Sequence, residues 1–328
     1  MLPSIKTKNE VAILSWVNRN TKIPVPEVFA YSSSADNALG QEYVLLSKEE
    51  GETLSDIYTE LDEQEKVGVV DQLIDFLLEL HSFEWNSIGG LVFKEVGEER
   101  EIIPGPVLEE TFWQVPDIEK FWPLQENLET LNIKGPYSTY VEYISAHIRK
   151  YVYAISLHNS LIFMRDSIPL INKFLEELKS HAKELNNVKL KLAHKDLHFG
   201  NILYSRSTGK ITSILDWEFA GIVPFTRWDP VKAFLWNGRG DGDREEGRRE
   251  RERWREVFEE RCRERGVWFL VQDAKFATKR QEMMQSAANY LRAVVEVAPR
   301  SEGMEGERTG DLVEWKGAFL RCIGEVGR

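Results

Sequence analysis

The sequence of 328 residues has few cysteines, no long apolar run and no excess of positive charge. Its two cysteines, Cys262 and Cys322, lack the spacing of a zinc site or a disulfide framework, so a reducing, intracellular compartment is expected. The absence of about 18 uninterrupted apolar residues excludes a spanning helix, and the first residues lack the apolar core of a secretory signal. A net charge of -12 argues against nucleic acid and anionic membranes as partners.

A hydrophobic content of 42% is enough for one large domain or for two lobes. Apolar periodicity and turn residues predict the elements along the chain. Helices are expected over 9–18, 53–81, 140–187 with a break at Pro169, 239–265 and 267–298; extended segments or strands over 21–31, 41–47 and 189–194; loops with short elements over 82–140, and a loop over 301–309. Asn9 is the expected cap of the first helix.

The segment 239–265 contains ten Arg and ten acidic residues, so its charges cancel. This pattern predicts a solvated helix with pairs of opposite charge four residues apart. It does not indicate a basic patch for nucleic acid.

Two short segments carry most of the functional information, LAHKDLHFGNILY and ITSILDWEFAG. In a phosphoryl-transfer site of the kinase type, an Asp follows a His in a loop, accepts the proton of the attacking hydroxyl, and precedes a magnesium-binding Asn by five positions. His194, Asp196 and Asn201 have this spacing. Asp216, at the end of the next apolar strand, is the expected second magnesium ligand.

Other interpretations of these residues stay open. His194 either orients the backbone near Asp216 or acts as a base itself, and the structural role is favoured because a carboxylate already fills the base position. The spacing His194, Asp196, His198 also fits a metal-dependent hydrolase. That alternative leaves Asn201 unexplained.

Both segments resemble the catalytic and metal segments of the aminoglycoside phosphotransferase and choline kinase family, relatives of the protein kinases. The resemblance covers roughly residues 9–236 and includes an insert like that of fungal members. It implies that Asp196 is the catalytic base, that Asn201 and Asp216 bind Mg²⁺, and that Asp229 braces the loop. It also implies ATP as phosphoryl donor and a small-molecule hydroxyl as acceptor.

The start of the chain departs from that family. Glu10 resembles the Glu that holds the phosphate-gripping Lys, but nine preceding residues cannot contain two strands, a phosphate loop and the Lys strand. Lys6 and Lys8 are poor substitutes, because that Lys should come from a separate strand. At the hinge, Ser47 stands where the family often has Glu, so the backbone around Lys48 and Glu49 is expected to hold adenine. Either the reading frame starts upstream, or the chain is a shortened member.

The predicted fold is α+β and protein-kinase-like, with two lobes. Residues 1–48 form an incomplete small β lobe, and residues 49–328 form a mainly helical lobe. The predicted function is ATP- and Mg²⁺-dependent phosphotransfer in the cytoplasm; a mitochondrial location stays open because of the N-terminal question. The alternative is a catalytically impaired pseudokinase or interaction module. Trp217, Trp228 and Trp236 suit either a cationic substrate or the core.

Overall fold

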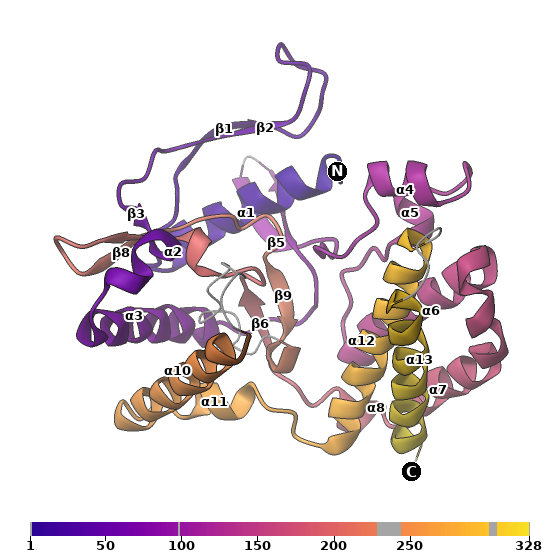
Figure 1. Ribbon diagram of the computed structural model, residues 1–328. Helices are drawn as coiled ribbons and strands as arrows, with labels where there is room; N and C mark the ends of the chain where they lie inside the picture. The colour runs from indigo at the N-terminus through magenta and orange to yellow at the C-terminus, as the bar shows by residue number, and fades with distance from the viewer. Residues whose placement is uncertain (1, 98, 228–243, 302–306, 328) are drawn as a thin grey trace. The chain divides into compact units, whose positions relative to one another are not determined.

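The computed structural model describes residues 2–97, 99–227, 244–301 and 307–327 (Figure 1). The chain divides into two compact units, each of which brings together segments far apart in the sequence. The helical unit is Met1–Leu2, Glu109–Val188 and Phe276–Arg328, and the mixed unit is Pro3–Leu108 and Lys189–Lys275. The division expected near residue 48 stays a prediction.

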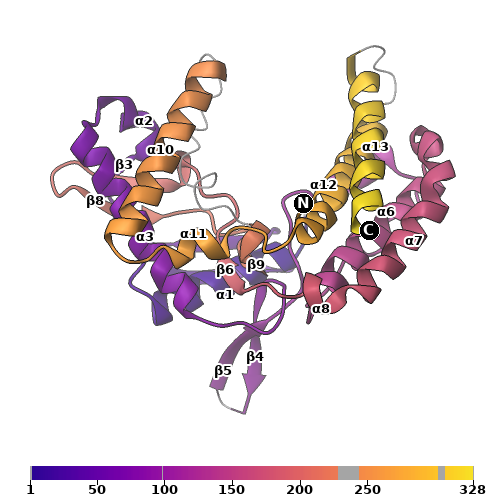
Figure 2. The same ribbon diagram turned by 90° about the horizontal axis from the view of Figure 1, so that it is seen from below.

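The helical unit is built from helices and turns alone in its described residues. They are α4 (Val115–Phe121), α5 (Leu128–Leu131), α6 (Tyr140–Leu157), the 3-10 segment η2 (Asn159–Ser167), α7 (Ile168–Ser180), α8 (Ala182–Leu185), α12 (Lys279–Arg300) and α13 (Glu307–Val326). The long helices α12 and α13 lie side by side (Figures 1 and 2). The break expected at Pro169 is confirmed, since Pro169 lies in the first turn of α7, where its missing N–H costs no helical bond.

The mixed unit contains the strands and the functional segments. Its elements are α1 (Ile5–Asn20), β1 (Val28–Ser32), β2 (Tyr43–Leu46), β3 (Glu52–Thr53), α2 (Leu54–Ile57), η1 (Tyr58–Glu60), α3 (Glu63–Ser82), β4 (Leu91–Val96), β5 (Glu99–Pro104), β6 (Leu190–Ala193), η3 (Phe199–Asn201), β7 (Ile202–Ser205), β8 (Lys210–Ile214), β9 (Gly221–Pro224), η4 (Phe225–Arg227), α10 (Arg244–Glu264) and α11 (Phe269–Asp273). The α+β class is therefore confirmed.

Two small antiparallel sheets position the functional segments. The first has the order β3-β7-β8 and pairs Ile202 with Ile214, and the second pairs β6 with β9. Two further hairpins, β1-β2 and β4-β5, complete the strands. The residues just before β7 and just after β8 are therefore neighbours in space.

The middle of helix α1 is buried on nearly all sides, which explains its run of apolar residues from Val11 to Val17. It begins at Ile5, so the prediction that Asn9 caps it is wrong. The helix starts earlier because Glu42, far along the chain, accepts from the backbone N–H of Ser4 at 2.7 Å and from Thr7 Oγ1 at 2.8 Å.

Helices α3 and α10 lie side by side (Figures 1 and 2). Helix α3 begins with a capping box, in which Asp62 accepts from the Glu65 N–H at 2.9 Å and Glu65 accepts from the Asp62 N–H at 2.8 Å. Helix α10 has the expected charge pairs, such as Arg248 with Glu252 at 3.0 Å. It also buries Trp254, Phe258 and Cys262, one turn apart, so it is not solvated on every side.

Two further points complete the fold. The loop expected over 301–309 is shorter, because α13 begins at Glu307. No helix in the described part of the chain is long and apolar enough to cross a membrane.

Candidate active site

The first functional segment is the loop between β6 and β7, which contains His194, Asp196 and Asn201. The side chain of Asn201 donates through Nδ2 to the carbonyl oxygen of Asp196 at 2.9 Å, and its backbone N–H donates to the carbonyl of His198 at 2.9 Å. Lys195 has φ 70°, a left-handed conformation that costs energy for a residue with a side chain. The loop is thus held in one specific conformation around Asp196.

The second segment follows β8 and meets the first loop through three residues. The Leu215 N–H donates to the Asn201 carbonyl at 2.8 Å, and His194 Nε2 lies 2.8 Å from the Leu215 carbonyl oxygen. Asp216, the next residue, has φ 61°, again left-handed. These bonds bring Asp196, Asn201 and Asp216 to one end of the β7-β8 pair.

His194 is buried and neutral. Because a carbonyl oxygen only accepts, Nε2 must carry the hydrogen that bonds Leu215. Burial lowers the pKa of His194 to about 4, and its ring packs on Trp217 with centroids 4.6 Å apart. These contacts fit the orienting role that the sequence favoured over a second base.

The two carboxylates of the site repel each other in a poorly solvated place. Burial raises the pKa of Asp196, and Glu218 raises it further. Burial also raises the pKa of Asp216, to which Asp196 adds, while Lys6 and His198 lower it. A divalent cation would relieve this repulsion.

Glu10 lies on α1 close to the same group. Burial raises the pKa of Glu10 to about 7, with smaller contributions from Glu218 and Asp216, and the charge of Lys6 lowers it. The side chain of Lys6, one turn earlier on α1, forms an ion pair with Glu218. Glu10 is therefore placed beside the predicted metal ligand.

Asn9 explains how α1 is held there, and the sequence interpretation missed its role. Its Nδ2 donates to the carbonyl oxygens of Ala220 at 2.9 Å and Glu218 at 3.2 Å, and its Oδ1 accepts from the Leu91 N–H at 2.8 Å. Gly90 allows this approach, since a Cβ there would lie 2.3 Å from Asn9 Oδ1. Gly89 and Gly90, just before Leu91, are a sequence signal for a close approach to the backbone, but they do not indicate that Asn9 is the residue that approaches.

The predicted adenine-binding residues belong to the same unit but to another part of it. The Ser47 N–H donates to the Glu27 carbonyl at 2.8 Å, and its hydroxyl donates to Glu49 at 2.5 Å. Lys48 is exposed. The segment leads into β3, which pairs with β7 directly after Asn201, so Ser47, Lys48 and Glu49 are linked to the site through the sheet.

The site offers the oxygen atoms that Mg²⁺ prefers. The Asn201 amide is oriented by its Nδ2 bond, so Oδ1 is the atom that could coordinate a cation, and Asp216 could add a carboxylate. Among the described residues, no group of three or more His, Cys, Asp and Glu side chains forms a metal site. The described residues therefore give no support to the His194, Asp196, His198 hydrolase.

The tryptophans that the sequence placed near the site have different positions. Trp217 is 1% exposed and donates to the Ile214 carbonyl at 2.9 Å, so it belongs to the core. Asp229, Trp228 and Trp236 lie outside the described residues.

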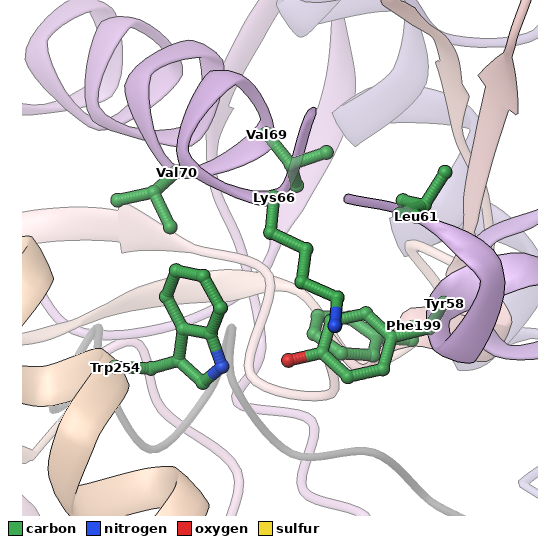
Figure 3. Close-up of a pocket in the computed structure, with 7 residues that line it drawn as sticks. All are labelled: Tyr58, Leu61, Lys66, Val69, Val70, Phe199 and Trp254. Atoms are coloured by element: carbon green, nitrogen blue, oxygen red, sulfur yellow. The ribbon is translucent and has the colours of Figure 1, made fainter. Parts of the chain in front are cut away.

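A small cavity lies behind the first loop. Figure 3 shows its walls, formed by Tyr58, Leu61, Lys66, Val69, Val70, Phe199 and Trp254. Phe199, from the loop, lies 4.7 Å from the Tyr58 ring, and Tyr58 donates to Glu250 of α10 at 2.8 Å. The cavity has a volume of about 10 Å³, room for about one water molecule, so α10 packs closely behind the loop.

Two curated relatives of the chain are fungal proteins. The chain is 27% identical over 261 residues to a subtelomeric hrmA-associated cluster protein of Aspergillus fumigatus, covering 66% of this chain and 50% of that protein. It is 25% identical over 284 residues to altered inheritance of mitochondria protein 9, mitochondrial, of Saccharomyces cerevisiae, covering 72% of this chain and 44% of that protein. The chain thus spans about half the length of these curated relatives.

Solved structures that match the chain at low sequence identity include two aminoglycoside phosphotransferases. A thermostable mutant of aminoglycoside phosphotransferase APH(4)-Ia with ADP and hygromycin B is 16% identical, with TM-score 0.48 over 98% of this chain and 84% of that one. The streptomycin-ATP-APH(2")-IIa ternary complex is 15% identical, with TM-score 0.48, and the match covers 99% of this chain and 83% of that one. The family described as "Phosphotransferase enzyme family" matches residues 3–132 and 164–259, more than half of the chain. The chain therefore belongs to this phosphotransferase family.

Proposed function

We propose that the protein transfers the γ-phosphoryl group of ATP to a hydroxyl of a small molecule, with Mg²⁺ as cofactor. One observation carries the proposal. Asp196, Asn201 and Asp216 converge because Asn201 bonds the Asp196 carbonyl through Nδ2 and the Leu215 N–H through its own carbonyl. This hydrogen-bonded unit supports the proposal, because phosphoryl transfer needs a base and oxygen ligands for the metal close together.

In the proposed reaction, the substrate hydroxyl oxygen forms a bond to the γ-phosphorus while the bond to the bridging oxygen of ADP breaks. Asp196 orients the hydroxyl and accepts its proton late in the reaction, so that a phosphate ester, ADP and a proton result. Its raised pKa suits a group that must take up this proton. His194 keeps the loop in place through Leu215 and takes no proton.

The remaining predicted residues have supporting roles. Asn201 and Asp216 would hold Mg²⁺, which neutralises the negative charge of the phosphates. The backbone around Ser47, Lys48 and Glu49 would hold adenine. Glu10 would orient the positively charged side chain that contacts the phosphates.

The acceptor is proposed to be a small molecule because of the family. The cytoplasm is the proposed compartment. The mitochondrial name of the yeast relative makes mitochondria the second compartment to examine by fractionation.

Calorimetric titration with ATP, in Mg²⁺ and in EDTA, tests the proposal together with phosphate release from ATP. We expect binding that requires Mg²⁺ and that is weakened by Asp216→Asn and Asn201→Ala, with slow Mg²⁺-dependent release of phosphate to water. A folded protein without any nucleotide binding would instead support the non-catalytic interaction module.

A further inference from the structure

Lys6 lies near the site, and the proposed function gives it no role. Its ammonium forms an ion pair with Glu218, two residues after Asp216, and lies 5.6 Å from the centre of the Phe219 ring. Its charge acts on Asp216 and on Glu10, whose pKa values it lowers. This places a positive charge within the carboxylate group of the site.

The start of α1 is fixed firmly enough to make this position reproducible. Glu42 binds Ser4 and Thr7, on either side of Lys6. Asn9 binds the carbonyls of Glu218 and Ala220, one turn further on. The backbone that carries Lys6 is thus attached to the segment that carries Asp216.

The negative charge of the site also favours a positively charged side chain next to it. Glu10 follows Asn9 on α1, and Asn9 bonds the carbonyl of Glu218, two residues after Asp216, so these carboxylates belong to two segments that are joined directly. ATP would bring further negative charge, so a positive side chain is needed in addition to the metal. The side chain of Lys6 is 36% exposed, which leaves its ammonium within reach of a ligand.

We propose that Lys6 binds the phosphates of the nucleotide, exchanging its partner Glu218 for phosphate oxygens when ATP and Mg²⁺ enter. The inference rests on the proposed function. It assigns the phosphate contact to the same helix that carries Glu10, whereas the sequence interpretation treated Lys6 as a poor substitute because no separate strand presents it. A compact ammonium on a flexible stem can make this exchange without moving the backbone.

Lys8 provides the matched control, since it is an exposed lysine on the same helix. The dissociation constants of ADP and ATP with Mg²⁺, and of adenosine, are measured for wild type, Lys6→Gln, Lys6→Arg, Lys8→Gln and Glu218→Gln. Circular dichroism checks that each variant is folded. We expect Lys6→Gln to weaken both nucleotides by about 10- to 100-fold and to leave adenosine unchanged. Lys6→Arg should lie between, and Lys8→Gln should match the wild type.

Glu218→Gln separates phosphate binding from a purely structural ion pair. If Lys6 binds phosphate, removing the charge of Glu218 releases Lys6 and leaves nucleotide affinity unchanged or tighter. If Lys6 only holds Glu218, both variants weaken binding alike, and the inference is overturned. If Lys6→Gln binds nucleotide as tightly as the wild type, this inference is overturned and the proposed function stands. If the wild type itself binds no nucleotide with Mg²⁺, both the proposed function and this inference are overturned.

Discussion

Asn9 on α1 donates through Nδ2 to the carbonyl oxygen of Ala220 at 2.9 Å, although the two residues are 211 positions apart. Asn9 is 2% exposed and also accepts the Leu91 N–H. Asn9→Ala should therefore leave a buried N–H without an acceptor and destabilise the protein by about 1–3 kcal/mol. Urea unfolding measures this loss.

Asn20→Ala is the control for that substitution. Asn20 bonds the Trp16 carbonyl at the end of the same helix, in an exposed position, so its loss should cost roughly 0.5–1 kcal/mol. Equal losses for Asn9→Ala and Asn20→Ala would refute the anchoring role of Asn9.

Gly90→Ala tests the same anchor from the other side. The added Cβ would lie 2.3 Å from Asn9 Oδ1 and 2.8 Å from the Pro106 carbonyl oxygen, so the backbone or Asn9 must move. We expect weaker nucleotide binding and a lower thermal midpoint. Gly97→Ala in the turn of the β4-β5 hairpin has open space around its Cβ and should affect only local turn strain. Unchanged nucleotide affinity in Gly90→Ala would contradict the prediction.

Arg261 contributes to the docking of α10 on α3. Its Nε and Nη2 bond both carboxylate oxygens of Asp71, at 2.9 and 2.7 Å. Both side chains are about one third exposed, so Arg261→Ala should cost only about 1 kcal/mol, part of it lost at high salt. Arg248→Ala, on the exposed face of α10, is the control and should stay within about 0.5 kcal/mol of wild type in urea unfolding. A larger loss for Arg248→Ala would show that the docking is not specific.

Glu296 on α12 predicts a pH dependence of stability. Burial raises its pKa from 4.5 to about 7, against a lowering by Arg292 and Arg300. Because the folded protein holds this proton more tightly than the unfolded chain, the contribution of Glu296 to stability is full below pH 4.5 and declines as the pH rises toward 7. The loss amounts to about 3 kcal/mol at most.

Glu296→Gln should therefore raise the thermal midpoint at pH 8 and change it little at pH 4.5. Glu282→Gln, an exposed acid on the same helix, should have no such pH-dependent effect. If Glu296→Gln shifts the midpoint equally at both values, the titration of Glu296 is not the cause.

Much of this molecule follows from local patterns in the sequence. The order His194, Asp196, Asn201, Asp216 predicted a convergent group because it has the spacing of a phosphoryl-transfer site of the kinase type. The helices α3 and α12 follow from periodic apolar residues. The strands β4 and β5 were not predicted individually, because β4 is only partly buried and shows no clean alternation of buried and exposed residues.

Long-range partners could not be predicted. Helix α1 begins at Ile5 because Glu42 holds its first turn, and Asn9 is buried because Ala220 and Leu91 need its amide. No residue adjacent to Ile5 or Asn9 in the sequence indicates these contacts. For the same reason the sequence placed Asn9 at a helix cap and undervalued Lys6.

The most direct test of the account compares wild type with Asp196→Asn, which keeps the shape and removes the base. Phosphate release from saturating ATP is measured in Mg²⁺, with the nucleotide dissociation constant measured for both proteins. The account predicts a rate at least about 100-fold lower in Asp196→Asn with nucleotide affinity within a few fold. Equal rates in the two proteins, or no Mg²⁺-dependent release by the wild type, would contradict it.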